Sequence, residues 1–177
     1  MHRQHRVMAA LNLGGGPAVL GSYVVGILGH PDTAGDLWGQ IPEALQPLYT
    51  ANMFVAAAGY LIFTAILWRR VDPGRTTTFA GLGFAWFNAC YAAILIASTL
   101  WMPLSFVALE RPTILPLVWL DLAVVAAGSL GMLLGLRRHF AGRPRPPGGR
   151  LAILGAALFC GQTVVLDFLI WPWFFRP

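Results

Sequence analysis

Residues 114–136 have the sequence ILPLVWLDLAVVAAGSLGMLLGL, in which only Asp121 carries a charge. A helix needs roughly 20 apolar residues to cross the hydrocarbon core of a bilayer, and this stretch is long enough. Four further stretches meet the same condition, at residues 7–28, 48–68, 79–102 and 151–174. The sequence therefore predicts an all-α integral membrane protein, a single domain over residues 1–177 built as a bundle of five transmembrane helices.

Composition and charge agree with lipid as the main solvent. Hydrophobic residues make up 57% of the chain and charged residues 11%, whereas soluble domains carry charge on about a quarter of their residues. The first apolar stretch is broken by residues 14–17, GGGP, and is long for the apolar part of a signal peptide. We therefore expect a retained, kinked helix there.

The arginine residues predict the orientation of the bundle. Ten of the twelve lie before the first stretch, between the second and third, or between the fourth and fifth; the other two are Arg111 and Arg176. The ten are Arg3, Arg6, Arg69, Arg70, Arg75, Arg137, Arg138, Arg143, Arg145 and Arg150. Because cytoplasmic segments are enriched in positive charge, we expect the N-terminus in the cytoplasm and the C-terminus outside, in a bacterial cytoplasmic membrane. The same placement accounts for the net charge of +5 without a nucleic-acid partner.

Two carboxylates fall inside the predicted spans, Asp121 and Asp167. Charged groups within a membrane are costly and usually face the interior of a bundle. Both are predicted to lie at similar depth in the outer half, and Thr163, four residues before Asp167, is predicted to share its helix face. Each acid can contact a ligand or handle a proton; alternatively, it forms an interhelical hydrogen bond or lies near enough to the interface to stay hydrated. For Asp121 these roles stay open, and for Asp167 the hydrogen bond or hydration is favoured.

Other in-span residues suggest how the helices pack. Asn12, Asn52 and Asn88 are predicted to link helices by hydrogen bonds, and Asn88, placed near mid-membrane, is a candidate to line a pocket. Small residues recur four apart, which lets helix backbones approach closely. They are Ala127, Gly131 and Gly135 in the fourth span and Ala157 and Gly161 in the fifth. These faces suit either packing within the chain or a homodimer.

Aromatic residues are predicted to crowd the outer half. The set comprises Trp38, Tyr49, Trp86, Trp101, Trp119, Trp171 and Trp173. Many of them suit an interfacial belt, where tryptophan prefers to sit. Trp38, Tyr49 and Trp101 also suit the walls of a site for a planar apolar ligand.

No catalytic motif is visible. The four histidines lie outside the predicted spans, which argues against a bis-histidine haem protein. Cys90 and Cys160 each lie within an apolar stretch, and their spacing does not predict a metal site or a redox motif. A binding role is therefore favoured over catalysis.

Three stretches resemble the translocator protein family (TspO, or peripheral benzodiazepine receptor). PLYTANMFVAAAGY, residues 47–60, resembles its second helix; STLWMPLSF, residues 98–106, is similar to its conserved tryptophan region; and GGGPAVLG, residues 14–21, is like its first helix. The chain departs from the family in having one tryptophan, Trp38, in the first external loop. It also has Ser98 where the family has asparagine, and LFCGQTVVLD in place of the fifth-helix signature.

The resemblance implies binding of a hydrophobic planar ligand, such as a porphyrin, haem or sterol, in the outer half of the bundle. The implied wall residues are Trp38, Tyr49, Asn88, Trp101 and Asp121. Two alternatives remain: an accessory subunit that holds pigment or lipid in a larger membrane complex, and a small lipid-modifying enzyme of isomerase type that uses Asp121 or Asp167.

Overall fold

The computed structural model describes residues 2–141 and 147–175, and all regular structure within these ranges is helical. The long helices are α1 (Arg3–Gly29), α2 (Gln46–Arg70), α3 (Ala85–Glu110) and α4 (Leu115–His139). The last span consists of α5 (Pro147–Cys160), a π-helix η6 (Gly161–Ile170) and the short α6 (Trp171–Phe174). Five helical segments are thus long and apolar enough to cross a membrane, which confirms the predicted number of such helices.

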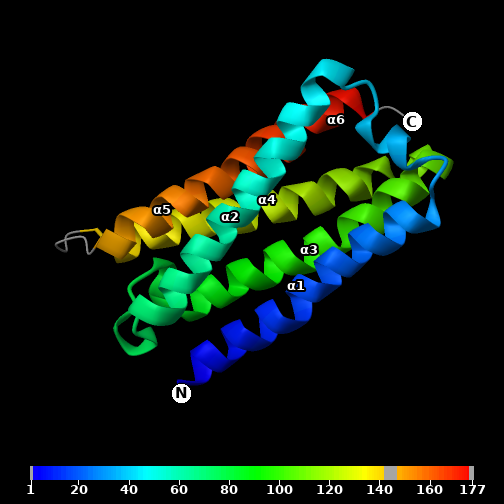
Figure 1. The fold of residues 1–177 in the computed structure, drawn as a ribbon. Coiled ribbons are helices and arrows are strands. Elements are labelled where there is room, and N and C mark those ends of the chain that lie inside the picture. Colours follow the sequence, from blue (N-terminus) through cyan, green and yellow to red (C-terminus); the bar gives the residue numbers. More distant parts are fainter. Residues whose placement is uncertain (1, 142–146, 176–177) are drawn as a thin grey trace.

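The helices form one elongated bundle (Figure 1). α1 packs along α3, α3 along α4, α2 along α5, and α4 against α5 and η6. One end of the bundle, here called the N-terminal end, carries the N-terminus and the α2–α3 connection. The other end, the C-terminal end, carries residues 30–45, the α3–α4 connection and the last described residues (Figure 1).

The third helix lies further along the chain than predicted. The sequence placed it at residues 79–102, but α3 covers Ala85–Glu110. Positive φ angles at Ala80, Gly81 and Gly83 keep the preceding residues out of the helix. Pro103 does not end the helix: α3 continues for seven residues beyond it. Neighbouring helices allow proline within transmembrane helices.

The described arginines gather at the N-terminal end. Those on its helix ends and connections are Arg3, Arg6, Arg69, Arg70, Arg75, Arg137, Arg138 and Arg150. Arg111 follows α3 at the C-terminal end. Arg143, Arg145 and Arg176, which also entered the orientation argument, lie outside the described residues.

Glycine residues allow the closest helix contacts. A Cβ atom on Gly131 would lie 2.9 Å from Cys90 Sγ, and one on Gly135 would lie 2.8 Å from the Trp86 ring, so this part of the α4 face packs within the chain against α3. Ala127, assigned to the same face, is exposed instead. Between α2 and α5, Gly59 and Gly155 meet backbone to backbone.

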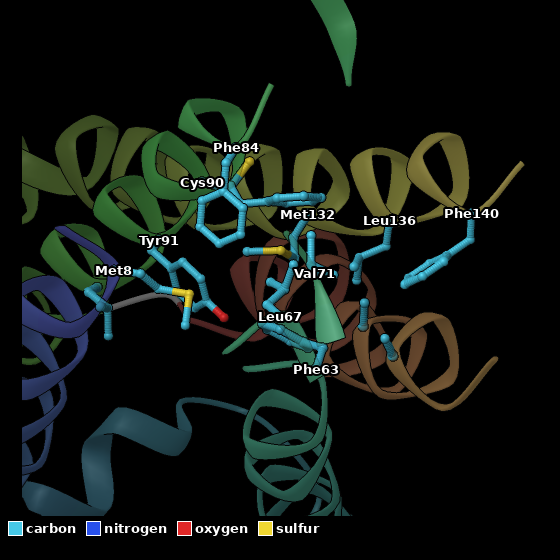
Figure 2. Close-up of a cluster of buried hydrophobic side chains, with 14 residues drawn as sticks. Met8, Phe63, Leu67, Val71, Phe84, Cys90, Tyr91, Met132, Leu136 and Phe140 are labelled. Atoms are coloured by element: carbon cyan, nitrogen blue, oxygen red, sulfur yellow. The ribbon is translucent and has the colours of Figure 1, made fainter. Parts of the chain in front are cut away.

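Buried side chains form two clusters. The first, at the N-terminal end, brings together Phe63 of α2, Tyr91 of α3 and Met132 of α4 (Figure 2). The second lies at the C-terminal end and includes Tyr49, Met102, Phe106 and Trp171. The candidate site is built on the second cluster.

Candidate functional site

A chain of aromatic rings crosses the C-terminal end of the bundle. Trp101 of α3 lies between Tyr23 of α1, with ring centroids 5.6 Å apart, and Trp171 of α6, at 5.9 Å. Trp171 in turn stacks on Phe175 at 4.2 Å. The rings therefore connect three parts of the sequence that lie far apart along the chain.

The segment from residue 30 to residue 45 folds over these rings. It contains two short 3₁₀ helices, Ala34–Trp38 and Glu43–Leu45. The Trp171 indole donates a hydrogen bond to the Leu37 carbonyl at 3.0 Å. The backbone N–H of Gln40 donates one to the Phe174 carbonyl at 2.9 Å. These two bonds hold the segment against the end of the fifth span.

Trp38 of this segment contacts Tyr49 of α2. Their rings pack edge to face with centroids 6.2 Å apart. The Tyr49 hydroxyl donates a hydrogen bond of 2.7 Å to the Leu166 carbonyl in η6. The structure therefore brings three of the five predicted wall residues, Trp38, Tyr49 and Trp101, to the same end of the bundle.

A cavity of about 460 Å³ opens beneath the same segment. Its lining includes His30, Thr33, Asp36, Phe106, Glu110 and Phe175. The His30 ring stacks on Phe106, with centroids 4.0 Å apart and planes 12° apart. The Nδ1 atom of His30 lies 3.0 Å from the Gly26 carbonyl. Because a carbonyl only accepts hydrogen bonds, Nδ1 carries a proton in this contact.

A polar network runs from α2 into the π-helix. The Asn52 amide donates to Gln162 Oε1 at 2.8 Å, and Gln162 Nε2 donates to Asp167 Oδ1 at 2.6 Å. Asp167 directly follows Leu166, whose carbonyl accepts the hydrogen bond from the Tyr49 hydroxyl. Asp167 thus bonds within its own span, and the expected direct bond to another helix is replaced by an indirect link through Gln162 to Asn52 of α2.

Asp167 bonds to Gln162 and not to Thr163. Gln162 lies five residues before Asp167 in the π-helix η6. Thr163 donates to the Phe159 carbonyl in α5, at 3.0 Å. The prediction that Thr163 shares the helix face of Asp167 stays a prediction, because neither bond tests it.

Trp101 has an unused hydrogen-bond donor. Its Nε1 atom is buried and has no partner among the residues that the structure describes. Buried indole N–H groups usually find a partner. A donor without one next to Tyr23 is therefore a candidate contact for a bound molecule.

Asn88 and Trp86 lie at the opposite end of the bundle. Because α3 begins at Ala85, both residues lie in its first turn. The predictions that Asn88 lies near mid-membrane and that Trp86 lies among the other aromatic residues are therefore wrong. The Asn88 amide donates to Gln4 Oε1 at 2.7 Å, and the Trp86 indole donates to the Gly131 carbonyl at 2.8 Å. Asn88 therefore lies away from the aromatic rings.

All three in-span asparagines connect helices, as expected. Asn52 bonds to Gln162 and Asn88 to Gln4, while Asn12 accepts a hydrogen bond of 2.7 Å from the Tyr60 hydroxyl.

Asp121 lies in a separate groove between α3 and α4. The groove has a volume of about 440 Å³, and none of the rings named above lines it. The structure thus separates Asp121 from Trp38, Tyr49 and Trp101.

Several residues at this end were not predicted. The contacts above also involve Tyr23, Gln162, His30 and Phe175. Of these, only Gln162 was detectable from the sequence, because it is a polar residue within an apolar stretch. Within residues 2–141 and 147–175, no three His, Cys, Asp or Glu side chains gather in a way that would hold a metal ion. Cys90 and Cys160 are both buried and unpaired with each other.

Comparisons of the chain with protein families, with curated proteins and with solved structures found no match. The resemblance to the translocator protein family therefore stays a prediction.

Proposed function

We propose that this chain is a membrane protein that binds a hydrophobic planar ligand of porphyrin, haem or sterol type. The ligand enters the cavity beneath residues 30–45 and lies against the aromatic rings at the C-terminal end of the bundle. The proposed orientation places this end outside the cell, since the arginines gather at the other end. The resemblance to the translocator protein family implies the same class of ligand.

The observation that carries the proposal is the continuity between the cavity and the aromatic rings. Phe175 lines the cavity and stacks on Trp171, which contacts Trp101. A volume of about 460 Å³ lies within the usual range of roughly 300–1,000 Å³ for small-molecule pockets. Flat ring faces stabilise a flat ligand by stacking, by about 0.5–1.5 kcal/mol for each pair.

The polar residues of the cavity bear on which planar ligand fits best. Asp36 and Glu110 both line it, and among the residues that the structure describes His30 is the only basic side chain in the lining. Acidic groups at the cavity disfavour a ligand that brings its own carboxylates close to them. A porphyrin would therefore bind with its propionates directed away from Asp36 and Glu110.

Titration of the purified protein with protoporphyrin tests the proposal. Trp171 stacks on Phe175 of the cavity lining, and Trp101 contacts Trp171, so a bound porphyrin quenches their fluorescence. Phe106→Leu and Trp101→Leu each remove one ring and weaken binding by about three- to tenfold. Trp119→Leu is the matched control, because Trp119 is exposed on α4 and lines neither the cavity nor the ring chain.

The dimethyl ester of protoporphyrin, which lacks the two carboxylates, tests the charge argument. It should bind more tightly than the free acid. If neither porphyrins nor sterols change the fluorescence of the unmodified protein, the proposed function is wrong.

A further inference from the structure

A second site lies on the outward face of the bundle, in the groove between α3 and α4. Alanine side chains of α3, among them Ala92 and Ala97, line one side. Leu117, Leu120 and Val124 of α4 line the other. Leu120 remains 61% exposed, so the groove opens away from the bundle interior. In a bilayer it would face the lipid.

Asp121 is the only polar residue that lines this groove. Its side chain is 7% exposed, and its Oδ2 atom has no hydrogen-bond partner among the described residues. The one ion pair found in residues 2–141 and 147–175 joins Asp72 to Arg75 at the other end of the bundle. A buried carboxyl group without a partner is costly, and this groove offers it no cation.

The shape of the groove suits a single extended chain. Its α3 side runs from Ala92 to Leu104, a length of about 18 Å at 1.5 Å per residue. No aromatic residue lines it, in contrast to the cavity beneath residues 30–45. A planar ring system therefore gains no stacking here, whereas an alkyl chain gains apolar contact along the alanines.

Asp121 sets the depth at which the head of such a molecule would lie. It is six residues beyond Leu115, the first residue of α4, and so about 9 Å along the helix axis. The ammonium group of a phospholipid is joined to a phosphate, which would have to descend to the same depth in hydrocarbon. A primary ammonium attached directly to an alkyl chain brings no anion with it.

We propose that this groove binds a single-chain amphiphile with a protonated primary amine, whose ammonium group pairs with Asp121 and whose alkyl chain lies on the alanines of α3. The site is independent of the planar-ligand site. A second copy of the chain is a poorer occupant, because a two-fold interface centred on this groove would bring two Asp121 side chains together without a cation.

Native mass spectrometry of the protein released from detergent tests this proposal. The probes are dodecylamine, dodecanol and dodecanoic acid, which share one alkyl chain and differ in the head group. We expect one molecule of dodecylamine per protein, bound at least about tenfold more tightly than dodecanol, since a hydrogen bond to a charged group contributes about 1.5–3 kcal/mol. Dodecanoic acid should bind no better than dodecanol.

Three variants locate the site. Asp121→Asn should lower dodecylamine binding to the level of dodecanol. Val124 lines the groove and is partly exposed, so the larger side chain of Val124→Phe should block binding of all three probes. This variant tests the site independently if Asp121→Asn does not fold. Asp167→Asn is the matched control, because it changes the other in-span acid and should leave dodecylamine binding unchanged.

Four results would overturn the proposal. They are equal binding of amine and alcohol, unchanged amine binding in Asp121→Asn, unchanged binding in Val124→Phe, and preferential binding of phosphatidylethanolamine over dodecylamine. A homodimer that Asp121→Asn dissociates would also overturn it, since the groove would then be an interface between copies. None of these results depends on porphyrin binding, so the two proposals fail separately.

Discussion

Replacing Gly59 by alanine should destabilise the fold, although alanine is the better helix former. A Cβ atom on Gly59 would lie 3.2 Å from the Gly155 carbonyl carbon and closer still to its oxygen. The reverse contact is equally tight, because a Cβ on Gly155 would lie 2.6 Å from the Gly59 carbonyl oxygen. Ordinary carbon contacts lie at about 3.5–4.0 Å.

The atoms that meet the added methyl group are backbone atoms, so they cannot rotate aside as a side chain would. α2 and α5 must therefore move apart along their contact. Overpacking of this kind costs about 1–3 kcal/mol, against a gain of about 1 kcal/mol in helix propensity. We expect a net loss of up to about 2 kcal/mol, which lowers the ratio of folded to unfolded protein by up to roughly thirtyfold.

The assay is unfolding of the purified protein in mixed micelles of rising dodecyl sulfate content, followed by circular dichroism. Gly14→Ala is the matched control, because nothing lies within 4 Å of a Cβ atom on Gly14, so only the propensity gain remains. Gly155→Ala should cost about as much as Gly59→Ala. The double variant should cost less than the sum, since one separation of the helices relieves both contacts. A Gly59→Ala protein as stable as Gly14→Ala would refute the close approach of α2 and α5.

Three further predictions concern the polar network, the cavity and the orientation. Gln162→Leu removes the hydrogen bonds to Asn52 and Asp167 and should lower the free energy of unfolding by about 1–3 kcal/mol in the same assay. Thr163→Val should cost less than about 1 kcal/mol. Equal losses would contradict the role of Gln162 as the residue that joins Asn52 to Asp167. His30 lines the cavity, and because its Nδ1 donates to the Gly26 carbonyl, its Nε2 carries the lone pair that could bind a haem iron. His30→Phe retains a ring but removes Nε2, so haem affinity, followed by absorbance, should fall while iron-free protoporphyrin binds as before. An equal change for both would exclude His30 as a ligand to the iron. With Cys90 and Cys160 replaced by alanine, a membrane-impermeant maleimide added to intact cells should label Gly35→Cys and not Gly74→Cys; the reverse pattern would invert the proposed orientation.

The number of helices followed from the sequence because bilayer thickness fixes how many apolar residues a span needs. The start of α3 did not, since residues 79–84 are as apolar as a helix requires. What excludes them is backbone conformation: Gly81 and Gly83 have φ angles of 68° and 55°. The error moved Asn88 from mid-membrane to the first turn of α3 and removed it from the candidate site.

The candidate site was predictable in part. Trp38, Tyr49 and Trp101 lie at the same end of the bundle because the order of antiparallel helices alone places them there. The cavity beneath residues 30–45 depends on how a segment with little regular structure folds back on the fifth span through hydrogen bonds such as Trp171 to Leu37. Contacts of that kind join residues more than 100 positions apart and leave no local pattern in the sequence.

The two in-span acids show most clearly what periodicity leaves undetermined. Each lies about two turns from the helix end that faces the C-terminal end of the bundle, as the sequence indicates. Their surroundings differ because Asp167 accepts a hydrogen bond from Gln162 within η6, whereas Asp121 lines the outward groove between α3 and α4. Asp167 is therefore satisfied by the protein itself and Asp121 is not. An acid that the fold leaves without a partner is the one whose partner has to come from outside the chain.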